Sequence, residues 1–277
     1  MELWVTEYQT KSLGFSCKVR ETLRTEQTEF QTLAVVDTEQ FGKMLLLDGM
    51  VMTTDVDEFV YHDMITQVAL NVHPNPKKVL IIGGGDGGAL REVVNHPNVE
   101  QGTLVEIDEK VVIASKDFFP QLSCTFSNAK SNVIIEDGIA FVKKHKNSFD
   151  VIIVDSTEPV GPAVELFSQS FYQDVYDCLH EDGILVAQTE SPFFNQDVIK
   201  MAFGGIAKVF PITKLYLASI PTYPSGLWSF TIGSKKYDPE VINFKADLNC
   251  KYYSPEVHEA AFKLPPFVKQ IINSIGE

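Results

Sequence analysis

The chain has 277 residues and a net charge of −14, from 23 basic and 37 acidic side chains. Nucleic-acid-binding proteins usually carry a basic surface, so this balance argues against that class and is compatible either with a cationic ligand or simply with solubility. No apolar run approaches the ~18 residues of a membrane span, and the N-terminus lacks the basic and apolar segments of a signal peptide. The four cysteines form no metal-binding pair, so we expect a cytoplasmic protein with reduced thiols.

Residues 1–55 are predicted to form a small antiparallel β-domain. Polar and apolar side chains alternate along most of this segment, and Asp48-Gly49 marks a turn. A helix is predicted from Asp57, because apolar side chains follow at helical spacing, and the prolines of residues 73–76 end it.

From Lys77 the pattern changes to apolar strands that alternate with helices, which predicts a parallel sheet covered on both faces. Only residues 221–225 separate the last two strand candidates. That connection is too short for a parallel crossover, so these two strands are predicted to be antiparallel. The layout resembles the Rossmann-like fold of AdoMet-dependent methyltransferases. We therefore predict an α/β domain over residues 56–277, with a short helical tail from about residue 237.

A glycine loop directly follows the first strand of this domain. Gly83, Gly85 and Gly88 form a GxGxxG pattern where a helix begins, and glycine lets the backbone approach a ligand closely. Glu106 ends the next strand, about 20 residues on, where an acid can bind both hydroxyls of a ribose. This pattern suits either a nicotinamide enzyme or an AdoMet-type enzyme. Asp137-Gly138, after the third strand, favours the AdoMet type because the carboxylate can accept the adenine amino group, although a helix N-cap explains Asp137 equally well.

Asp86 lies inside the glycine loop, whereas ordinary methyltransferases carry an acid just before the first glycine, where this chain has Ile81-Ile82. A carboxylate within the loop would repel a cofactor tail that keeps its own carboxylate and would suit a bare ammonium. Asp86 therefore points to a decarboxylated donor. The alternative is an aspartate that only caps the following helix.

The fourth strand ends in the segment DSTEPVGPA, which holds Asp155 and Glu158 at the edge of the sheet where ligands bind. Two carboxylates without a cationic side chain between them favour a bound cation, and a diamine would satisfy both. A metal bound by oxygen ligands alone is the rival explanation, since no histidine lies in this segment. Tyr223, in a proline-rich loop, could bind an amine, and the helical His62 either joins the site or makes a structural hydrogen bond.

These residues together resemble the spermidine synthase family of aminopropyltransferases, in the form found in Gram-positive bacteria. The resemblance rests on LLLDGMVMTTDVDEFVYHDM, GGGDGG, LVEID, VDSTEPVGPA, VAQTES and IPTYPSGLWSFTIGSKKYDP, and covers essentially the whole chain. It implies transfer of the aminopropyl group of decarboxylated S-adenosylmethionine, as co-substrate, to putrescine, without a metal or prosthetic group. It also implies that the N-terminal β-domain makes a homodimer or homotetramer.

The resemblance also assigns roles to individual residues. Asp155 is implied as the general base and Asp86 as the partner of the donor's ammonium group. The implied nucleoside-binding residues are Gln31, Gly83, Gly85, Asp86, Glu106, Asp137, Gly138 and Pro162. The implied polyamine-binding residues are Tyr61, His62, Asp86, Asp155, Ser156, Thr157, Glu158 and Tyr223.

One position departs from many members of the family, which have Asp where this chain has Glu158. The longer side chain would reach further into the acceptor pocket, so agmatine, cadaverine and spermidine stay open as acceptors. Three other functions stay open: an amine N-methyltransferase on the same fold, a non-catalytic polyamine or nucleoside sensor, and a nicotinamide oxidoreductase.

Overall fold

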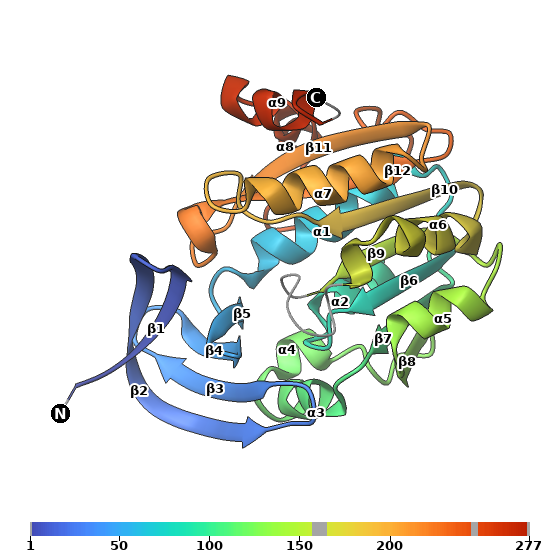
Figure 1. Cartoon of the computed structure of the whole chain (residues 1–277). Helices are drawn as coiled ribbons and strands as arrows, with labels where there is room; N and C mark the ends of the chain where they lie inside the picture. Colours follow the sequence, from blue (N-terminus) through green and yellow to red (C-terminus); the bar gives the residue numbers. More distant parts are fainter. Residues whose placement is uncertain (1, 157–164, 245–248, 276–277) are drawn as a thin grey trace.

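The computed structural model describes residues 2–156, 165–244 and 249–275, and it contains two β-sheets (Figure 1). The first is a five-stranded antiparallel sheet in which the strands follow the order of the chain. Its strands are β1 (Leu3–Thr10), β2 (Leu13–Gln27), β3 (Thr32–Thr38), β4 (Gly42–Leu47) and β5 (Met50–Thr54).

The second sheet has seven strands in the order β11-β12-β10-β9-β6-β7-β8. The described strands of this sheet are β6 (Lys78–Gly83), β7 (Gln101–Glu106), β8 (Ser131–Ile135), β9 (Phe149–Asp155), β10 (Leu179–Gln188), β11 (Ile212–Ser219) and β12 (Leu227–Ser234). Strands β8, β7, β6, β9 and β10 pair in parallel, and β12 is antiparallel to both β10 and β11. The predicted α/β fold with one antiparallel strand is confirmed, and β12 reaches its place by inserting between β10 and β11.

Helices cover both faces of the second sheet (Figure 1). Among the described residues they are α1 (Glu58–Val72), α2 (Gly88–Asn95), α3 (Glu109–Phe118), α4 (Pro120–Ser123), α5 (Gly138–Lys144), α6 (Gln169–Cys178), α7 (Gln196–Ala207), α8 (Pro255–Ala261) and α9 (Pro266–Asn273). None of the helices in the described ranges is long and apolar enough to cross a membrane.

Alternate residues of each central strand enter different cores. Val79 and Ile81 of β6 pack with α1 and α2 on one face, whereas Leu80 and Ile82 pack with α5 and α6 on the other. Side chains of a strand point alternately to the two faces, so a strand buried on both sides needs an unbroken apolar run. This explains why the central strands are continuously apolar.

The two sheets are joined through helices α3 and α4. Leu33 and Leu45 of the N-terminal sheet pack against Val111 of α3 and Leu122 of α4 in one buried cluster. The opposite side of the same strands holds Val36 and other apolar side chains in a separate cluster. The N-terminal sheet is therefore fixed against the helix that comes after β7, close to the carboxyl end of that strand.

The C-terminal segment is held by a buried carboxylate of α1. Oδ2 of Asp63 accepts hydrogen bonds from the backbone N–H groups of Tyr252 (2.7 Å) and Tyr253 (3.1 Å), and Asp63 itself is buried. Tyr253 and Phe262 then join the core beside α1. Asp63 thus fixes to α1 the segment that leads into α8, whereas α9 packs on α7.

We predict that Asp63→Ala lowers the free energy of unfolding by about 2 kcal/mol, because two backbone donors lose their acceptor in a buried place. Chemical denaturation measures the change. Glu259→Ala, an exposed substitution on α8, is the control and should leave stability unchanged. Equal stability of the two variants would contradict the role given to Asp63.

Candidate active site

Three strand ends meet beside the glycine loop. Gly83, the last residue of β6, pairs in register with Asp155, the last residue of β9, and the N–H of Gly84 donates to the carbonyl oxygen of Asp155 at 2.9 Å. Glu106 ends β7 on the other side of β6. Parallel strands present their carboxyl ends at one edge of the sheet, which is where open α/β sheets bind ligands.

Two glycines of the loop make room for the carboxylates beside them. A Cβ atom on Gly84 would lie 2.7 Å from Oδ2 of Asp155, and one on Gly85 would lie 2.9 Å from Oε2 of Glu106. Gly84 also has a positive φ of 66°, which side chains other than that of glycine rarely allow. The loop therefore needs glycine in order to pack closely against two acids.

These residues line a cavity of about 220 Å³. Its wall includes most of the predicted site residues, which are Gln31, Tyr61, Gly83, Gly85, Asp86, Glu106, Asp137, Gly138, Asp155, Ser156 and Tyr223. The structure thus brings together residues that span almost two hundred positions of the sequence. Thr157, Glu158 and Pro162 lie outside the described residues.

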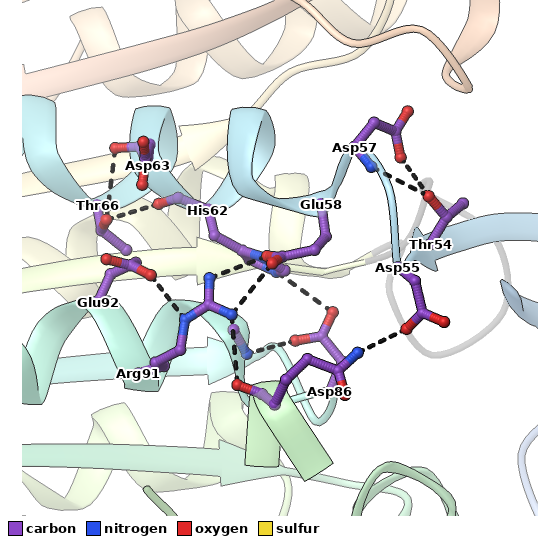
Figure 2. A network of polar contacts seen from close by, with 12 residues as sticks. Thr54, Asp55, Asp57, Glu58, His62, Asp63, Thr66, Asp86, Arg91 and Glu92 are labelled. Atoms are coloured by element: carbon purple, nitrogen blue, oxygen red, sulfur yellow. Dashed lines mark hydrogen bonds and ion pairs between the residues drawn. The ribbon is translucent and has the colours of Figure 1, made fainter. Parts of the chain in front are cut away.

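His62 is the predicted site residue that does not reach the cavity wall among those described. Its ring lies behind Asp86 and is only 1% exposed. Both ring nitrogens have partners, since Nδ1 is 2.6 Å from Oε2 of Glu58 and Nε2 is 3.3 Å from Oδ2 of Asp86 (Figure 2).

Asp155 is a half-buried carboxylate held by one phenol. The hydroxyl of Tyr61 donates to Oδ1 of Asp155 at 2.6 Å. Burial and the nearby charge of Asp86 raise the pKa of Asp155 to about 6, against the opposing effects of His62 and Tyr61. Burial and the Asp155 charge raise the pKa of Tyr61 well above its usual value, so the phenol remains a hydrogen-bond donor. Asp155 can therefore take up a proton near neutral pH.

Asp86 has two fixed oxygens. Oδ1 accepts from the backbone N–H of Gly88, the first residue of α2, at 2.7 Å, although the N-cap of this helix is Gly87, and Oδ2 faces His62. The side chain still lines the cavity. The hydrogen bond to the start of α2 therefore leaves Asp86 in a position where it can also meet a ligand.

The other end of the cavity is lined by Glu106, Asp137 and Gln31. Glu106 accepts from the N–H groups of Asp108 (2.9 Å) and Gly85 (3.2 Å), and burial raises its pKa to about 7. Asp137 caps α5 by accepting from the N–H of Ile139 at 2.8 Å. Glu106 and Asp137 lie where β7 and β8 end, at the edge where open α/β sheets bind ligands, and Gln31 comes from the turn between β2 and β3.

Tyr223 links the two sheets across the cavity. Its hydroxyl donates to the carbonyl oxygen of Met52 in β5 at 2.6 Å, and its ring contacts the ring of Tyr61 with centroids 5.4 Å apart. Asp57, before α1, accepts from both the N–H (3.0 Å) and the hydroxyl (2.8 Å) of Thr222, which fixes the loop that carries Tyr223.

The cavity wall also holds residues that the sequence did not predict, among them Glu7, Gln188, Glu190 and Trp228. Glu190 is fully buried and has a positive φ of 74°, a strained backbone that often marks a functional position. Glu190 could have been predicted from the sequence, because it follows the end of β10 and so lies at the same edge of the sheet as the other acids. Glu7 lies in β1 of the other sheet, and no sequence pattern relates it to this site.

Within the described ranges, no group of three or more His, Cys, Asp or Glu side chains is arranged to hold a metal ion. The described site is instead rich in carboxylates and aromatic rings. An acidic cavity of this kind suits an organic cation, whose charge the carboxylates balance and whose alkyl chain the rings cover.

A glycine loop after the first strand, an acid at the end of the second and a half-buried carboxylate at the end of the fourth are typical of an enzyme with its site at the edge of a Rossmann-like sheet. The chain belongs to the spermine/spermidine synthase family. Residues 58–246 match the spermine/spermidine synthase domain, and residues 3–55 match the spermidine synthase tetramerisation domain.

Relatives and solved structures agree with this family. The chain is 59% identical to a polyamine aminopropyltransferase of Caldicellulosiruptor saccharolyticus, over 98% of this chain and 99% of the relative. It is 53% identical to the polyamine aminopropyltransferase of Shouchella clausii, over 98% of this chain and the whole relative. A crystal structure of spermidine synthase in complex with the transition-state analogue AdoDATO superposes with a TM-score of 0.95 at 45% identity, over 98% of this chain and 95% of that one. The crystal structure of the spermidine synthase of Thermotoga maritima superposes with a TM-score of 0.93 at 45% identity, over 98% of this chain and 94% of that one.

Proposed function

We propose that this chain transfers the aminopropyl group of decarboxylated S-adenosylmethionine to putrescine, which yields spermidine and methylthioadenosine. The observation that carries the proposal is a pair of carboxylates on the wall of one cavity, Asp86, which is buried, and Asp155, which is half-buried. The donor brings an ammonium group and the acceptor brings two, so binding of both substrates would compensate the negative charge.

We assign the donor to the part of the cavity formed by the glycine loop. Glu106 would bind the ribose hydroxyls, Asp137 with Gly138 the adenine, and Asp86 the ammonium group of the aminopropyl chain. Gln31 would contact the nucleoside from the N-terminal sheet, where its Nε2 also donates to Oδ2 of Asp108 at 3.0 Å. Pro162 is the last residue that we assign to binding of the nucleoside.

We assign the acceptor to the part of the cavity between Tyr61, Tyr223 and Asp155. A primary alkylamine resembles lysine, with a pKa of about 10.4, so deprotonating it near pH 7 costs roughly 4–5 kcal/mol. Asp155 would accept this proton, while the hydrogen bond from Tyr61 keeps the carboxylate oriented. Ser156, Thr157 and Glu158 would bind the acceptor from the segment after β9.

In the transfer step, the lone pair of the amine attacks the methylene carbon next to the sulfonium. The carbon–sulfur bond breaks and its electron pair stays on sulfur, which leaves as a neutral thioether and needs no acid. The proton that the attacking amine gave up is by then on Asp155, and the new nitrogen keeps its other two protons as a secondary ammonium. The rest of the rate enhancement would come from holding the nitrogen, carbon and sulfur atoms in one line.

We also propose a homo-oligomer that works in the cytoplasm. The match of residues 3–55 to a tetramerisation domain supports assembly, and so do the exposed apolar side chains of β1 and β2. These side chains are Leu3, Trp4, Tyr8 and Leu13. Trp4 and Tyr8 lie four residues apart on β1 and so point to the same face, and exposed apolar groups of this size commonly mark a contact between subunits.

Mass spectrometry of the products tests the proposed reaction. Decarboxylated S-adenosylmethionine is incubated with equimolar putrescine, cadaverine, agmatine and spermidine, and a parallel sample contains intact S-adenosylmethionine. We expect methylthioadenosine and spermidine as the dominant products. A different dominant adduct would change the acceptor, and methylated amine in the parallel sample alone would make the chain a methyltransferase.

We predict that Asp155→Asn lowers kcat by about 10²–10⁴-fold, because the amine loses its proton acceptor, while methylthioadenosine still binds. Steady-state kinetics and calorimetry measure the two effects. Asp150→Asn, at the opposite end of the same strand, is the control, since Asp150 accepts from the N–H groups of Lys77 and Lys78, outside the cavity. Normal turnover by Asp155→Asn would remove Asp155 as the base.

We predict that Asp86→Asn weakens binding of decarboxylated S-adenosylmethionine by about tenfold or more and that of methylthioadenosine by less than about twofold, since the second ligand lacks the ammonium group. Calorimetry compares the two ligands. Glu106→Gln is the matched control and should weaken both ligands equally, because both contain the ribose. Equal losses caused by Asp86→Asn would contradict its assignment.

A further inference from the structure

Asp108 is a buried side chain close to the nucleoside end of the cavity, the part lined by Gln31, Glu106 and Asp137. It lies two residues after the end of β7, is only 2% exposed and does not belong to the cavity wall. Its side chain is the N-cap of α3, because Oδ1 accepts from the backbone N–H of Lys110 at 3.0 Å. A helix cap needs one oxygen, and the second oxygen of Asp108 has two other donors.

Both of these donors come from the turn between β2 and β3 of the N-terminal sheet. Oδ2 of Asp108 accepts from the hydroxyl of Thr28 at 2.8 Å and from Nε2 of Gln31 at 3.0 Å. The Thr28 hydroxyl oxygen itself accepts from the backbone N–H groups of Phe30 and Gln31, both at 3.0 Å. One oxygen of Asp108 therefore holds both the turn and the side-chain amide of Gln31.

The contact with Asp108 also sets the orientation of the Gln31 amide. Nε2 is the donor end of a glutamine side chain, so the hydrogen bond to Oδ2 turns this nitrogen toward Asp108 and the carbonyl oxygen away from it. Gln31 lines the cavity, whereas Asp108 does not. A substitution at position 108 can thus change the cavity wall without removing a group from it.

The backbone of Asp108 makes a separate contact at the same end of the cavity. Its N–H donates to Oε1 of Glu106 at 2.9 Å, and the N–H of Gly85 donates to Oε2 of Glu106 at 3.2 Å. A substitution of the Asp108 side chain keeps this backbone donor. The support of Gln31 can therefore be removed while that of Glu106 remains.

Two ion pairs also join β2 to α3. Glu26 is 2.7 Å from Lys110, and Arg24 is 3.2 Å from Asp117, but both pairs are partly exposed. Ion pairs of this kind contribute little, whereas buried hydrogen bonds to a side-chain oxygen contribute more. The contacts of Asp108 therefore constrain the turn more strongly than the two ion pairs do.

We propose that Asp108 is a positioning residue, which holds the turn of residues 28–31 and the amide of Gln31 against the nucleoside end of the cavity and acts on the ligand through Gln31. This inference rests on the proposed function, which assigns Gln31 to the nucleoside. It makes the seating of the N-terminal sheet a determinant of donor affinity.

A double-mutant cycle on the affinity for methylthioadenosine, measured by calorimetry, tests the proposal. Asp108→Ser is the informative variant, because serine still caps α3 but lacks the second oxygen that Thr28 and Gln31 use. We expect Asp108→Ser and Gln31→Ala each to raise the Kd by about fivefold. The double variant should stay within about twofold of Gln31→Ala, whereas independent effects would multiply to about 25-fold.

Asp117→Ser is the matched control. The same substitution on the same helix removes an exposed link to β2, and it should leave the Kd for methylthioadenosine unchanged. Steady-state kinetics adds a second readout. Asp108→Ser should raise the KM for the donor and leave that for putrescine unchanged, a difference that a loss of stability alone would not produce.

If Asp108→Ser fails to fold, Thr28→Val tests the same contact from the half-buried side of the turn. Valine keeps the volume of the side chain and removes the hydroxyl that donates to Asp108. The Kd for methylthioadenosine should rise by about threefold. In a Gln31→Ala background, Thr28→Val should have little further effect.

The outcomes separate this inference from the proposed function. A wild-type protein that binds methylthioadenosine but forms no aminopropyl product refutes the proposed function. An active wild type whose affinity is unchanged by Asp108→Ser, or by Thr28→Val if only that variant folds, refutes the positioning role alone. Effects of Asp108→Ser and Gln31→Ala that multiply in full also refute it, and so does a raised KM for putrescine with an unchanged KM for the donor.

Discussion

The pairing of β6 with β9 is the constraint on which the site depends. It sets Gly83 opposite Asp155 and ties Gly84 to the same residue through the backbone. That contact creates the need for glycine at position 84, since a side chain there would collide with the carboxylate. The acid of the fourth strand and the loop of the first strand are therefore parts of one structural unit, although about seventy positions separate them in the sequence.

Concentrating carboxylates around a buried cavity is costly, and the protein limits this cost in two ways. Backbone and phenol donors hold the individual acids, as for Glu106 and Asp155. Behind Asp86, the Arg91 guanidinium and the His62 ring, whose pKa the two neighbouring carboxylates raise well above its usual value, alternate with the acids Glu58 and Asp86. The cavity itself keeps its negative character, because these cations lie behind the wall. A bound polycation would then compensate the negative charge that the cavity wall retains.

Features that depend on where the strands end could be predicted from the sequence. The apolar runs of the central strands identify the parallel sheet, and the sheet brings Asp86, Glu106 and Asp155 to one edge. The short loop before β12 predicts an antiparallel strand, but not its insertion between β10 and β11, because the pairing partner depends on the whole sheet. The helical pattern predicts that His62 lies near the site, but it does not predict which carboxylates the ring contacts. Glu7 could not be found, since it reaches the cavity from a separate sheet.

The hydrogen bond from Tyr223 to Met52 has a consequence for how the two sheets depend on each other. Part of the cavity wall comes from β1, β4 and β5, including Glu7, Leu45 and Met52, and the rest comes from the larger sheet. The main sheet without residues 1–55 would be an open trough that cannot enclose a ligand. A ligand that fills this cavity would contact both sheets, so its binding energy would also resist their separation. Ligand binding should therefore stabilise the association of the two sheets within the subunit.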